Sequence, residues 1–405
     1  MHPFVRFESL RVRVRLREEY IYIHVKILHI MMMRSLNARA ICTRNRIIPV
    51  TFIIIAALLL VHAAAVHRPR PRDPAADARF VAAVAVVGAP SDRAHRYEPS
   101  SLEAEWTRDA RARARAGVLC AVIASEAPLW PRWLEVSLAA RAGAVLPPTA
   151  PADTSIWSTM TVSLGGVDAP VRLEPLAGFL RDPREGTCSA HGLTPTIPDF
   201  PDSKALIFLD PTFYARVASH LASSSLSPRP RALLFDAGST RWQSAPVAGQ
   251  PERSGLAWFI DTYKALGIEF DAVYAWEAAV KPARDYFSDM PTRIAARTHF
   301  YNVPVTDAGG GLDDVIAVIK TVSAPGDFVV FKLDIDTEHL EESIVLRLLE
   351  EADAGELVDD FFFEHHVDCD IMRKWWGPVD LRDLHDSYSL FAALRKRGIR
   401  AHSWP

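Results

Sequence analysis

Between residues 231 and 404 the sequence alternates short apolar runs with segments of helical spacing, and this alternation limits the fold more than any other feature. The apolar runs have the length of strands. They are Arg231–Asp236, Asp271–Glu277, Thr298–Val305, Phe328–Leu333, Asp360–Glu364 and Ile399–Trp404. The predicted helices between them are Ser254–Leu266, Leu312–Val322, Leu340–Glu351 (with a glutamate-rich outer face) and Leu381–Arg397. This order predicts an α/β fold with a doubly wound, mainly parallel, Rossmann-like sheet.

Acidic residues stand at the ends of three of these predicted strands. Asp236 closes the first run and Gly238 follows it, Glu277 closes the second, and Asp334 and Asp336 follow the fourth. If the fourth strand extended that far, its period of two would direct Asp334 and Asp336 to the same side. Ligands of open α/β sheets bind at the carboxyl ends of the strands. We therefore expect a ligand site at this edge.

Three blocks of this region resemble the S-adenosylmethionine-dependent methyltransferase fold, and specifically the FkbM-type methyltransferases. LLFDAGST (233–240) resembles the first motif of the family, and VYAWEA (273–278) resembles its second-strand motif. FVVFKLDIDTEHLEESIVLRLL (328–349) resembles its Lys-x-Asp-x-Glu-Gly strand and the following helix. FFFEHH (361–366) stands where the family has a fifth strand ending near Glu-x-His.

The resemblance implies S-adenosylmethionine as the cofactor and a class I methyltransferase-like domain over residues 231–405. Asp236 and Gly238 would then line the methionine part of the cofactor, and Glu277 would hold its ribose. Lys332, Asp334 and Asp336 would face the transfer site. Methyl transfer to a hydroxyl of a glycan or a small metabolite needs alignment of the acceptor and removal of its proton, for which Asp334 or Asp336 is the candidate base.

The sequence departs from the family at three points. Thr240 replaces a second glycine, Asp336-Thr337 replaces Glu-Gly, and the last strand pair is short by one member. A catalytically degenerate, Rossmann-like binding module is therefore one alternative. The other is a glycosyltransferase, in which the Asp334-x-Asp336 carboxylates would hold a divalent cation and a nucleotide-sugar.

Possible metal ligands also gather after the fifth run, at Glu364-His365-His366 and Asp368-Cys-Asp370. Adjacent histidines on a strand point to opposite faces, so a hydrogen-bonded strand end is favoured over a metal site. We expect His365, His366 and Trp376 near the substrate, since their segment follows the strand next to Asp334. A tryptophan can stack on a sugar ring.

The sequence of the N-terminal part has the features of a membrane protein. Residues 1–46 carry ten Lys/Arg and three Asp/Glu, and residues 47–66 are apolar over the length of a bilayer-spanning helix. The expectation is a single-pass signal anchor, with a cleaved signal peptide as the alternative, which directs the chain to the secretory pathway or Golgi. An Arg/Ala/Pro-rich stem (67–117) and an accessory region of unclear fold (118–230) follow. The body is mildly acidic, so we expect no nucleic-acid partner.

Overall fold

The computed structural model describes residues 12–16, 19–23, 73–86, 96–113, 156–164, 166–176, 204, 207–223, 228–242, 255–367 and 382–404. The chain divides into two units, residues 1–68 and residues 69–405. In the first, strands β1 (Val12–Leu16) and β2 (Glu19–Ile23) form an antiparallel hairpin. No helix among the described residues is long and apolar enough to cross a membrane. The expected anchor (47–66) and Trp376 lie outside the described residues.

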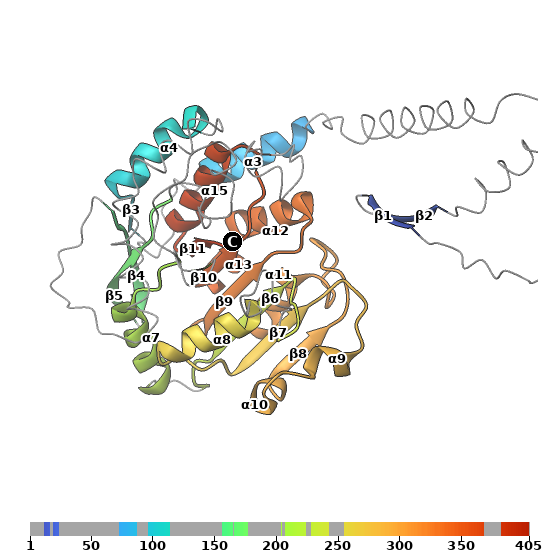
Figure 1. Cartoon of the computed structure of the whole chain (residues 1–405). Coiled ribbons are helices and arrows are strands. Elements are labelled where there is room, and N and C mark those ends of the chain that lie inside the picture. The colour runs from blue at the N-terminus through green and yellow to red at the C-terminus, as the bar shows by residue number, and fades with distance from the viewer. Residues whose placement is uncertain are drawn as a thin grey trace, which may run out of the picture. The chain divides into compact units, whose positions relative to one another are not determined.

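The second unit contains a six-stranded sheet in which every pairing is parallel (Figure 1). Its strands are β6 (Ala232–Ala237), β7 (Ala272–Trp276), β8 (Thr298–Tyr301), β9 (Phe328–Leu333), β10 (Asp360–Phe363) and β11 (Arg400–Ser403). The order across the sheet is β11-β10-β9-β6-β7-β8. This is a doubly wound order whose direction switches between β6 and β9, so the expected parallel α/β sheet is confirmed. Since β10 pairs directly with β11, no further strand lies between them.

The central strands are buried on both faces, which explains their unbroken apolar sequences. All six residues of β6 and all six of β9 are buried. Successive residues alternate between two cores: Leu233 and Phe235 belong to one, and Ala232 and Leu234 to the other. A sheet of this kind has only its strand ends left for polar chemistry.

Helices cover both faces of the sheet (Figure 1). One core includes residues of α3 (Pro74–Val86), α4 (Ser101–Arg113), α11 (Val315–Val322), α12 (Glu338–Glu350), α13 (Ala352–Leu357) and α15 (Leu384–Lys396). The other includes residues of α7 (Pro211–Ser223), α8 (Gly255–Ala265), α9 (Ala283–Phe287) and α10 (Thr292–Ala295). A small antiparallel sheet of β3 (Arg96–Glu98), β4 (Ser158–Leu164) and β5 (Val167–Leu173) packs against this second core. The predicted stem and accessory region thus contribute elements to the same compact unit.

The prediction that the glutamates of α12 lie on an exposed outer face is wrong for two of them. Glu341 is 2% exposed and Glu342 is 6% exposed. Glu342 is buried because Arg382 donates two hydrogen bonds to its carboxylate, at 2.6 and 2.7 Å. Glu341 is buried because it accepts a hydrogen bond from the backbone N–H of Ile335 at 2.7 Å. Paired or hydrogen-bonded carboxylates can be buried where isolated ones cannot.

Arg395 of α15 joins the small sheet to the large one. Its side chain is fully buried and donates to Glu103 at 3.2 Å and to the backbone carbonyl of Glu174 at 2.9 Å. Glu174 also contacts His402 of β11 at 2.8 Å. These buried charges are compensated only while all partners are present.

We predict that Arg395→Met lowers the free energy of unfolding by about 3–5 kcal/mol, because it leaves Glu103 and Glu174 buried without their cation. Chemical denaturation followed by circular dichroism measures this loss. Arg111→Met is the control, since Arg111 is 65% exposed and pairs with Asp383 at the surface, where such a pair contributes at most about 1 kcal/mol. Equal losses for the two variants would contradict the prediction.

Candidate active site at the carboxyl edge of the sheet

The ends of β6 and β9 meet through their backbones at the switch point of the sheet. Gly238 follows β6 with a φ of 84°, in the left-handed region that glycine adopts without strain. A Cβ at this position would lie 1.6 Å from the carbonyl oxygen of Asp334. The family resemblance implies that this glycine lines the methionine part of a cofactor. The close approach in the structure is to the main chain of Asp334.

The backbone N–H groups of the turn after β6 already donate hydrogen bonds within the protein. The N–H groups of Gly238 and Ser239 donate to the carbonyl oxygen of Trp276, at 3.1 and 2.7 Å. A turn that cradles a pyrophosphate needs such amides free to point at the ligand. This turn therefore lacks that feature of a dinucleotide-binding loop.

Lys332 lies at the centre of the site and connects the two strands. Its Nζ is 3.3 Å from Asp236 Oδ1 and 3.1 Å from Asp334 Oδ2, and its side chain is 4% exposed. It also donates to the carbonyl oxygens of Gly238 at 2.9 Å and Ala237 at 3.3 Å. Burial acts to lower the pKa of Lys332, but Asp334 and Asp236 outweigh it and the pKa is raised. Lys332 is therefore a buried cation that its partners hold in a fixed position.

Asp236 is the partner of Lys332 across the strands, since the two residues are in register. The Asp236 side chain is 1% exposed, and neither of its oxygens accepts a hydrogen bond. Its 3.3 Å contact with Lys332 is an ion pair without hydrogen-bond geometry. Asp236 thus retains unused acceptor capacity beside the switch point.

Glu277 follows β7 directly, and its side chain is 15% exposed. Its carboxylate accepts a hydrogen bond from the N–H of Ala279 at 2.8 Å and pairs with the ammonium of Lys281. The sequence also missed a buried pair beside it: Ser239 Oγ and Tyr286 Oη lie 2.8 Å apart. Burial raises the pKa of Tyr286, and the nearby Asp236 and Glu277 carboxylates add to this rise. No motif marks Tyr286, because it comes from the short helix α9 and reaches the site only through folding.

Asp334 and Asp336 do not act as a pair. The expectation of a common side required the strand to continue, but β9 ends at Leu333 and Asp336 has a φ of 55°. Asp334 consequently contacts Lys332. Asp336 instead lies with Glu364 and His366, and the ligand atoms of these three side chains are all within 4.8 Å of one another.

Several carboxyl groups lie close together at the carboxyl edge of the sheet, and the pKa values of two of them are raised. Burial and the neighbouring Glu364 raise the pKa of Asp334 to about 6, against the opposing effect of Lys332. Burial raises the pKa of Glu341 to about 8, although the N–H of Ile335 favours its ionised form. The sequence missed Glu341 because its position on the helix suggested a solvated face.

The two histidines after β10 point in different directions, as the sequence predicted. His365 Nδ1 lies 3.0 Å from Ser387 Oγ, and the His365 ring stacks on Phe363. Burial lowers the pKa of His365 to about 3. His366 lies 3.6 Å from Glu364, and its side chain is 10% exposed. Only His366 joins the acidic residues at the strand ends.

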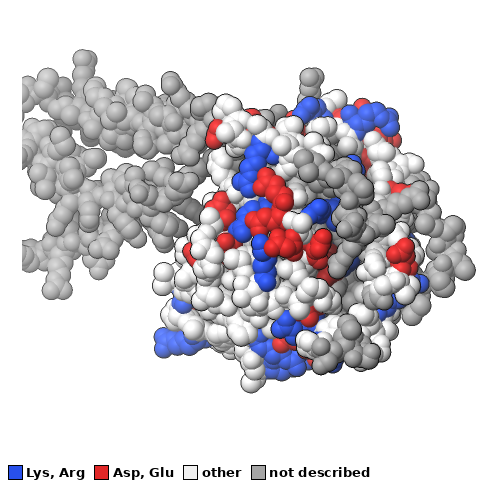
Figure 2. Space-filling view, turned by 180° about the vertical axis from the view of Figure 1, so that it is seen from behind, with Lys and Arg blue, Asp and Glu red and all other residues white. Residues whose placement is uncertain are grey.

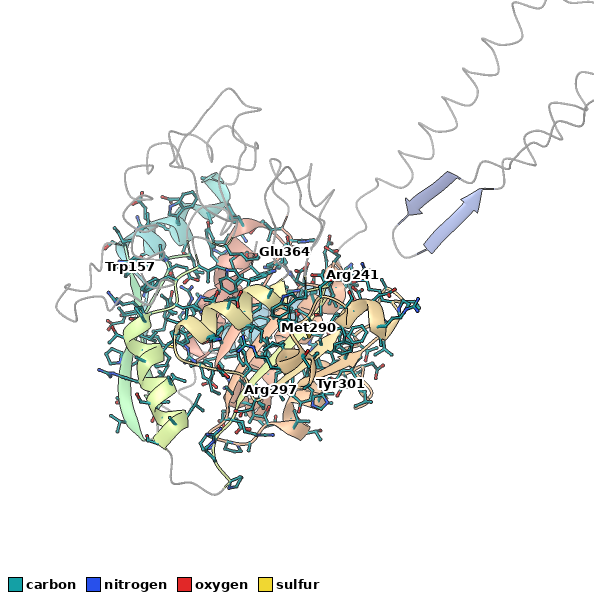
Figure 3. All side chains as sticks on the ribbon, turned by 60° about the horizontal axis from the view of Figure 1, so that its bottom comes forward. Trp157, Arg241, Met290, Arg297, Tyr301 and Glu364 are labelled. Carbon is teal, nitrogen blue, oxygen red and sulfur yellow. The ribbon has the colours of Figure 1, made fainter. Side chains whose placement is uncertain are left out.

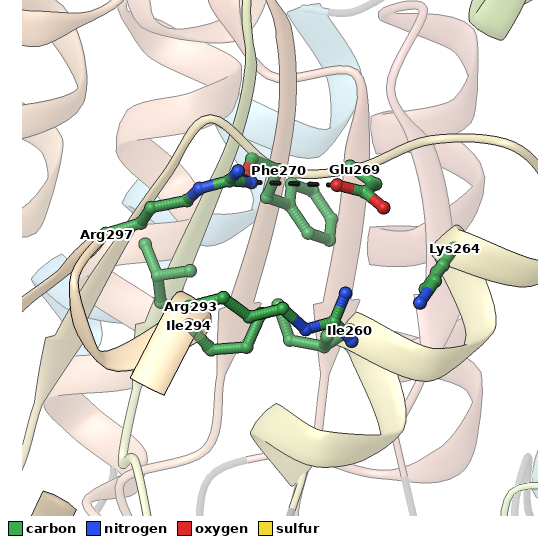
Figure 4. A pocket seen from close by; sticks show the side chains of 8 residues that line it. Ile260, Lys264, Glu269, Phe270, Arg293, Ile294 and Arg297 are labelled. Atoms are coloured by element: carbon green, nitrogen blue, oxygen red, sulfur yellow. Dashed lines mark hydrogen bonds and ion pairs between the residues drawn. The ribbon is translucent and has the colours of Figure 1, made fainter. Parts of the chain in front are cut away.

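Glu364 follows β10 at the carboxyl end of the sheet, whereas Arg297 precedes β8 at the amino end; both are labelled in Figure 3. A separate, shallow surface pocket lies near Arg297 (Figure 4). Ile260, Phe270, Val273 and Ile294 contribute apolar lining, with Lys264, Arg293 and Arg297 as cations around them. This pocket is distinct from the acidic site, since Val273 belongs to the start of β7.

The face of the molecule in Figure 2 carries interleaved cations and carboxylates. Surface ion pairs of this kind include Lys320 with Glu351 at 3.0 Å and with Asp353 at 2.7 Å. Charges that alternate in sign screen one another and create little long-range field.

Comparison with known proteins yields no match: no protein-family model, no curated protein and no solved structure is similar to this chain.

We predict that Gly238→Ala destabilises the protein by about 3 kcal/mol or more, because left-handed strain adds to a clash with the Asp334 backbone. The matched control is Gly166→Ala. Gly166 has a φ of 81°, and a Cβ there would meet no atom within 4 Å, so only strain of about 1–2 kcal/mol is expected. Thermal unfolding of both variants separates the cost of backbone strain from the cost of the clash. Similar losses of stability in the two variants would contradict the close contact between Gly238 and the Asp334 backbone.

We predict that Glu341→Gln raises the stability of the metal-free protein at pH 8 but not at pH 4.5. An ordinary glutamate has a pKa of 4.5, whereas that of Glu341 is raised to about 8. Between these values the unfolded chain loses the proton freely and the folded chain retains it, so wild-type stability falls as the pH rises. Glutamine still accepts the bond from Ile335 and does not titrate.

The measurement is the melting temperature between pH 4.5 and 8 in EDTA, and the variant should gain several degrees at the upper end. Glu350→Gln, on the more exposed end of the same helix, should show no such trend. A constant difference between Glu341→Gln and wild type across this range would contradict the prediction.

Proposed function

We propose that residues 231–405 transfer a methyl group from S-adenosylmethionine to a hydroxyl of a glycan or small metabolite. The observation that carries the proposal is the position of two acids at neighbouring strand ends of a doubly wound sheet. Asp236 lies at the end of β6 and Glu277 directly after β7, beside the switch point where such sheets bind nucleotide-like ligands. The resemblance of the surrounding motifs to FkbM-type methyltransferases supports the same cofactor.

The charge of the site favours a cationic cofactor. S-adenosylmethionine carries a sulfonium, an ammonium and a carboxylate group, a net charge of +1. The described strand ends present three acids, Asp236, Asp334 and Glu277, against two lysines, since Lys332 pairs with the first two and Lys281 pairs with Glu277. A dinucleotide would bring a pyrophosphate, for which the Gly238 and Ser239 amides are already used. Opposite charge stabilises bound ligands in such partly buried sites.

In this proposal Glu277 accepts hydrogen bonds from the ribose hydroxyls, and Asp236 and Gly238 line the methionine part. When bound, S-adenosylmethionine would supply the methyl group: the acceptor oxygen would bond to the methyl carbon as the carbon–sulfur bond breaks, with S-adenosylhomocysteine as the product. Asp334 takes the proton of the hydroxyl, since its side chain is 25% exposed and Lys332 fixes its orientation. Lys332 itself has no free lone pair and acts as the positioning cation.

The glycosyltransferase alternative receives less support. It needs both carboxylates of Asp334-x-Asp336 on one cation, whereas Asp334 contacts Lys332 and Asp336 lies with Glu364 and His366. A non-enzymatic binding module remains an outcome of the tests below. The proposed single-pass anchor at residues 47–66 rests on the sequence alone and would bring the domain into the secretory pathway.

Calorimetric titration with S-adenosylhomocysteine, in EDTA, tests the cofactor assignment. We predict binding by the wild type and at least about tenfold weaker binding by Glu277→Gln, because a bidentate acceptor for the ribose is lost. Glu269→Gln is the control, since Glu269 is 56% exposed and precedes β7 at the amino end of the sheet. Absence of binding by the wild type, or an equal loss in the control, would overturn the proposal. Binding of a nucleotide-sugar instead, dependent on manganese, would establish the alternative.

A further inference from the structure

A second pocket lies at the amino end of the large sheet, away from the candidate active site. Phe328 begins β9, Asp359 directly precedes β10 and Arg400 begins β11, and all three residues line this pocket. Further lining comes from β4 of the small sheet, α7 and α13. The apolar lining residues are Val162, Leu164, Phe213, Val217, Phe328 and Val358. Since the proposed methyl transfer takes place at the carboxyl ends of the strands, this pocket has no part in it.

Two arginines line the pocket because the chain turns sharply between them. Arg397 is the C-cap of α15, and Arg400 begins β11. Gly398 has a φ of 99°, in the left-handed region that glycine adopts without strain. The N–H of Ile399 donates to the carbonyl oxygen of Leu394 at 3.1 Å, which is a helix-ending hydrogen bond of the Schellman type. The turn thus brings the end of a helix and the start of a strand to the same pocket.

Arg400 is held in place on several sides, but one of its nitrogens has no hydrogen-bond acceptor. Its side chain is 2% exposed, and its guanidinium carbon lies 4.7 Å from the ring centroid of Phe213. Its Nε donates to Asp360 Oδ1 at 2.5 Å. Its Nη2 is buried without a hydrogen bond, and Asp359 Oδ1 at 3.6 Å is too far to accept one. Since Asp359 also lines the pocket, this end of Arg400 is directed towards the pocket.

Arg397 supplies a second buried donor without an acceptor, since its Nε has no hydrogen-bond partner. Its side chain passes closely over α13 at Gly355. A Cβ on Gly355 would lie 3.1 Å from Arg397 Nε and 2.5 Å from the carbonyl oxygen of Leu348. Buried donors in folded proteins nearly always have an acceptor, and leaving one without a partner is unfavourable. Two such donors from two arginines of one pocket indicate a ligand that accepts hydrogen bonds from both.

The charges of the lining favour a ligand with a single negative charge. The lining contains two arginines, Arg397 and Arg400, and two acids, Glu356 and Asp359. A dianion such as phosphate would be repelled by the two acids, whereas a carboxylate can accept hydrogen bonds from guanidinium groups through its two oxygens. The apolar lining would contact an apolar substituent, as in most sites for small molecules.

We propose that this pocket binds a small apolar monocarboxylate. Arg397 Nε and Arg400 Nη2 would each donate to the carboxylate, after a small rotation of the Arg397 side chain, which is only half-buried. The apolar end would lie against the valines of β4, α7 and the segment before β10. Since the lining joins the small sheet to the first residues of β9 and β11, the ligand would stabilise the contact between the two sheets. The site is independent of the proposed methyl transfer.

Thermal unfolding of the full-length protein in sodium butyrate, at constant ionic strength, tests the site. Butyramide has the same shape as butyrate without its charge. The wild type should gain several degrees of melting temperature in saturating butyrate and none in butyramide, because a ligand that binds only the folded state stabilises it. Calorimetric titration with butyrate should show an affinity at least about tenfold lower for Arg397→Gln, since a charged donor is lost. Without butyrate, Arg397→Gln should melt close to the wild type, because Arg397 Nε has no partner to lose.

The matched control is Arg216→Gln, which should bind butyrate like the wild type. Arg216 is an exposed residue of α7 and does not line the pocket. No binding of butyrate by the wild type would show that the two donors are satisfied by water and would overturn the proposal. Equal gains in butyrate and butyramide, or an equal loss of affinity in Arg216→Gln, would also overturn it. Stabilisation by inorganic phosphate as large as that by butyrate would contradict the assignment of a monocarboxylate.

Discussion

The buried Lys332 ammonium between Asp236 and Asp334 is the interaction on which the site depends. It connects β6 and β9 at the point where the sheet changes direction, and it donates to the backbone that turns away from β6. Without a cation at this position the buried carboxylate of Asp236 and the partly buried carboxylate of Asp334 would lose the partner that they share, which is unfavourable. The lysine thus allows acidic groups to stand at both strand ends, and the glycine turn brings those ends close enough for one side chain to reach both.

Lys332 compensates the charges of Asp236 and Asp334, and further carboxyl groups lie near these two residues. Burial, with a smaller contribution from neighbouring carboxyl groups, raises the pKa of Asp334 to about 6 and that of Glu341 to about 8. In the proposed function, the sulfonium cofactor would lie towards Asp236 and Glu277, on the β6 and β7 side of Lys332.

The described elements before residue 231 stabilise the large sheet through contacts with α12, α15 and β11, away from the site. Arg395 and His402 hold Glu103 and Glu174 in a fully buried network, and Arg382 connects Asp77 of α3 to Glu342 of α12 at 2.7 and 2.6 Å. These pairs fix α12, whose first turn carries Glu341. The described N-terminal elements therefore influence the site through the position of a helix.

The sequence by itself determined the parallel α/β sheet, because strands buried on both faces must be continuously apolar and the intervening helices must be amphipathic. It also located Asp236, Gly238, Glu277 and Lys332 at strand ends, and it separated His365 from His366 by the alternation of side chains. The tertiary structure decided which of these residues meet. The end of β9 at Leu333 separates Asp334 from Asp336, and the folding of α9 and α12 brings in Tyr286 and Glu341. Local periodicity reports which face a residue occupies within its own element, whereas contacts between distant elements depend on packing that no local pattern encodes.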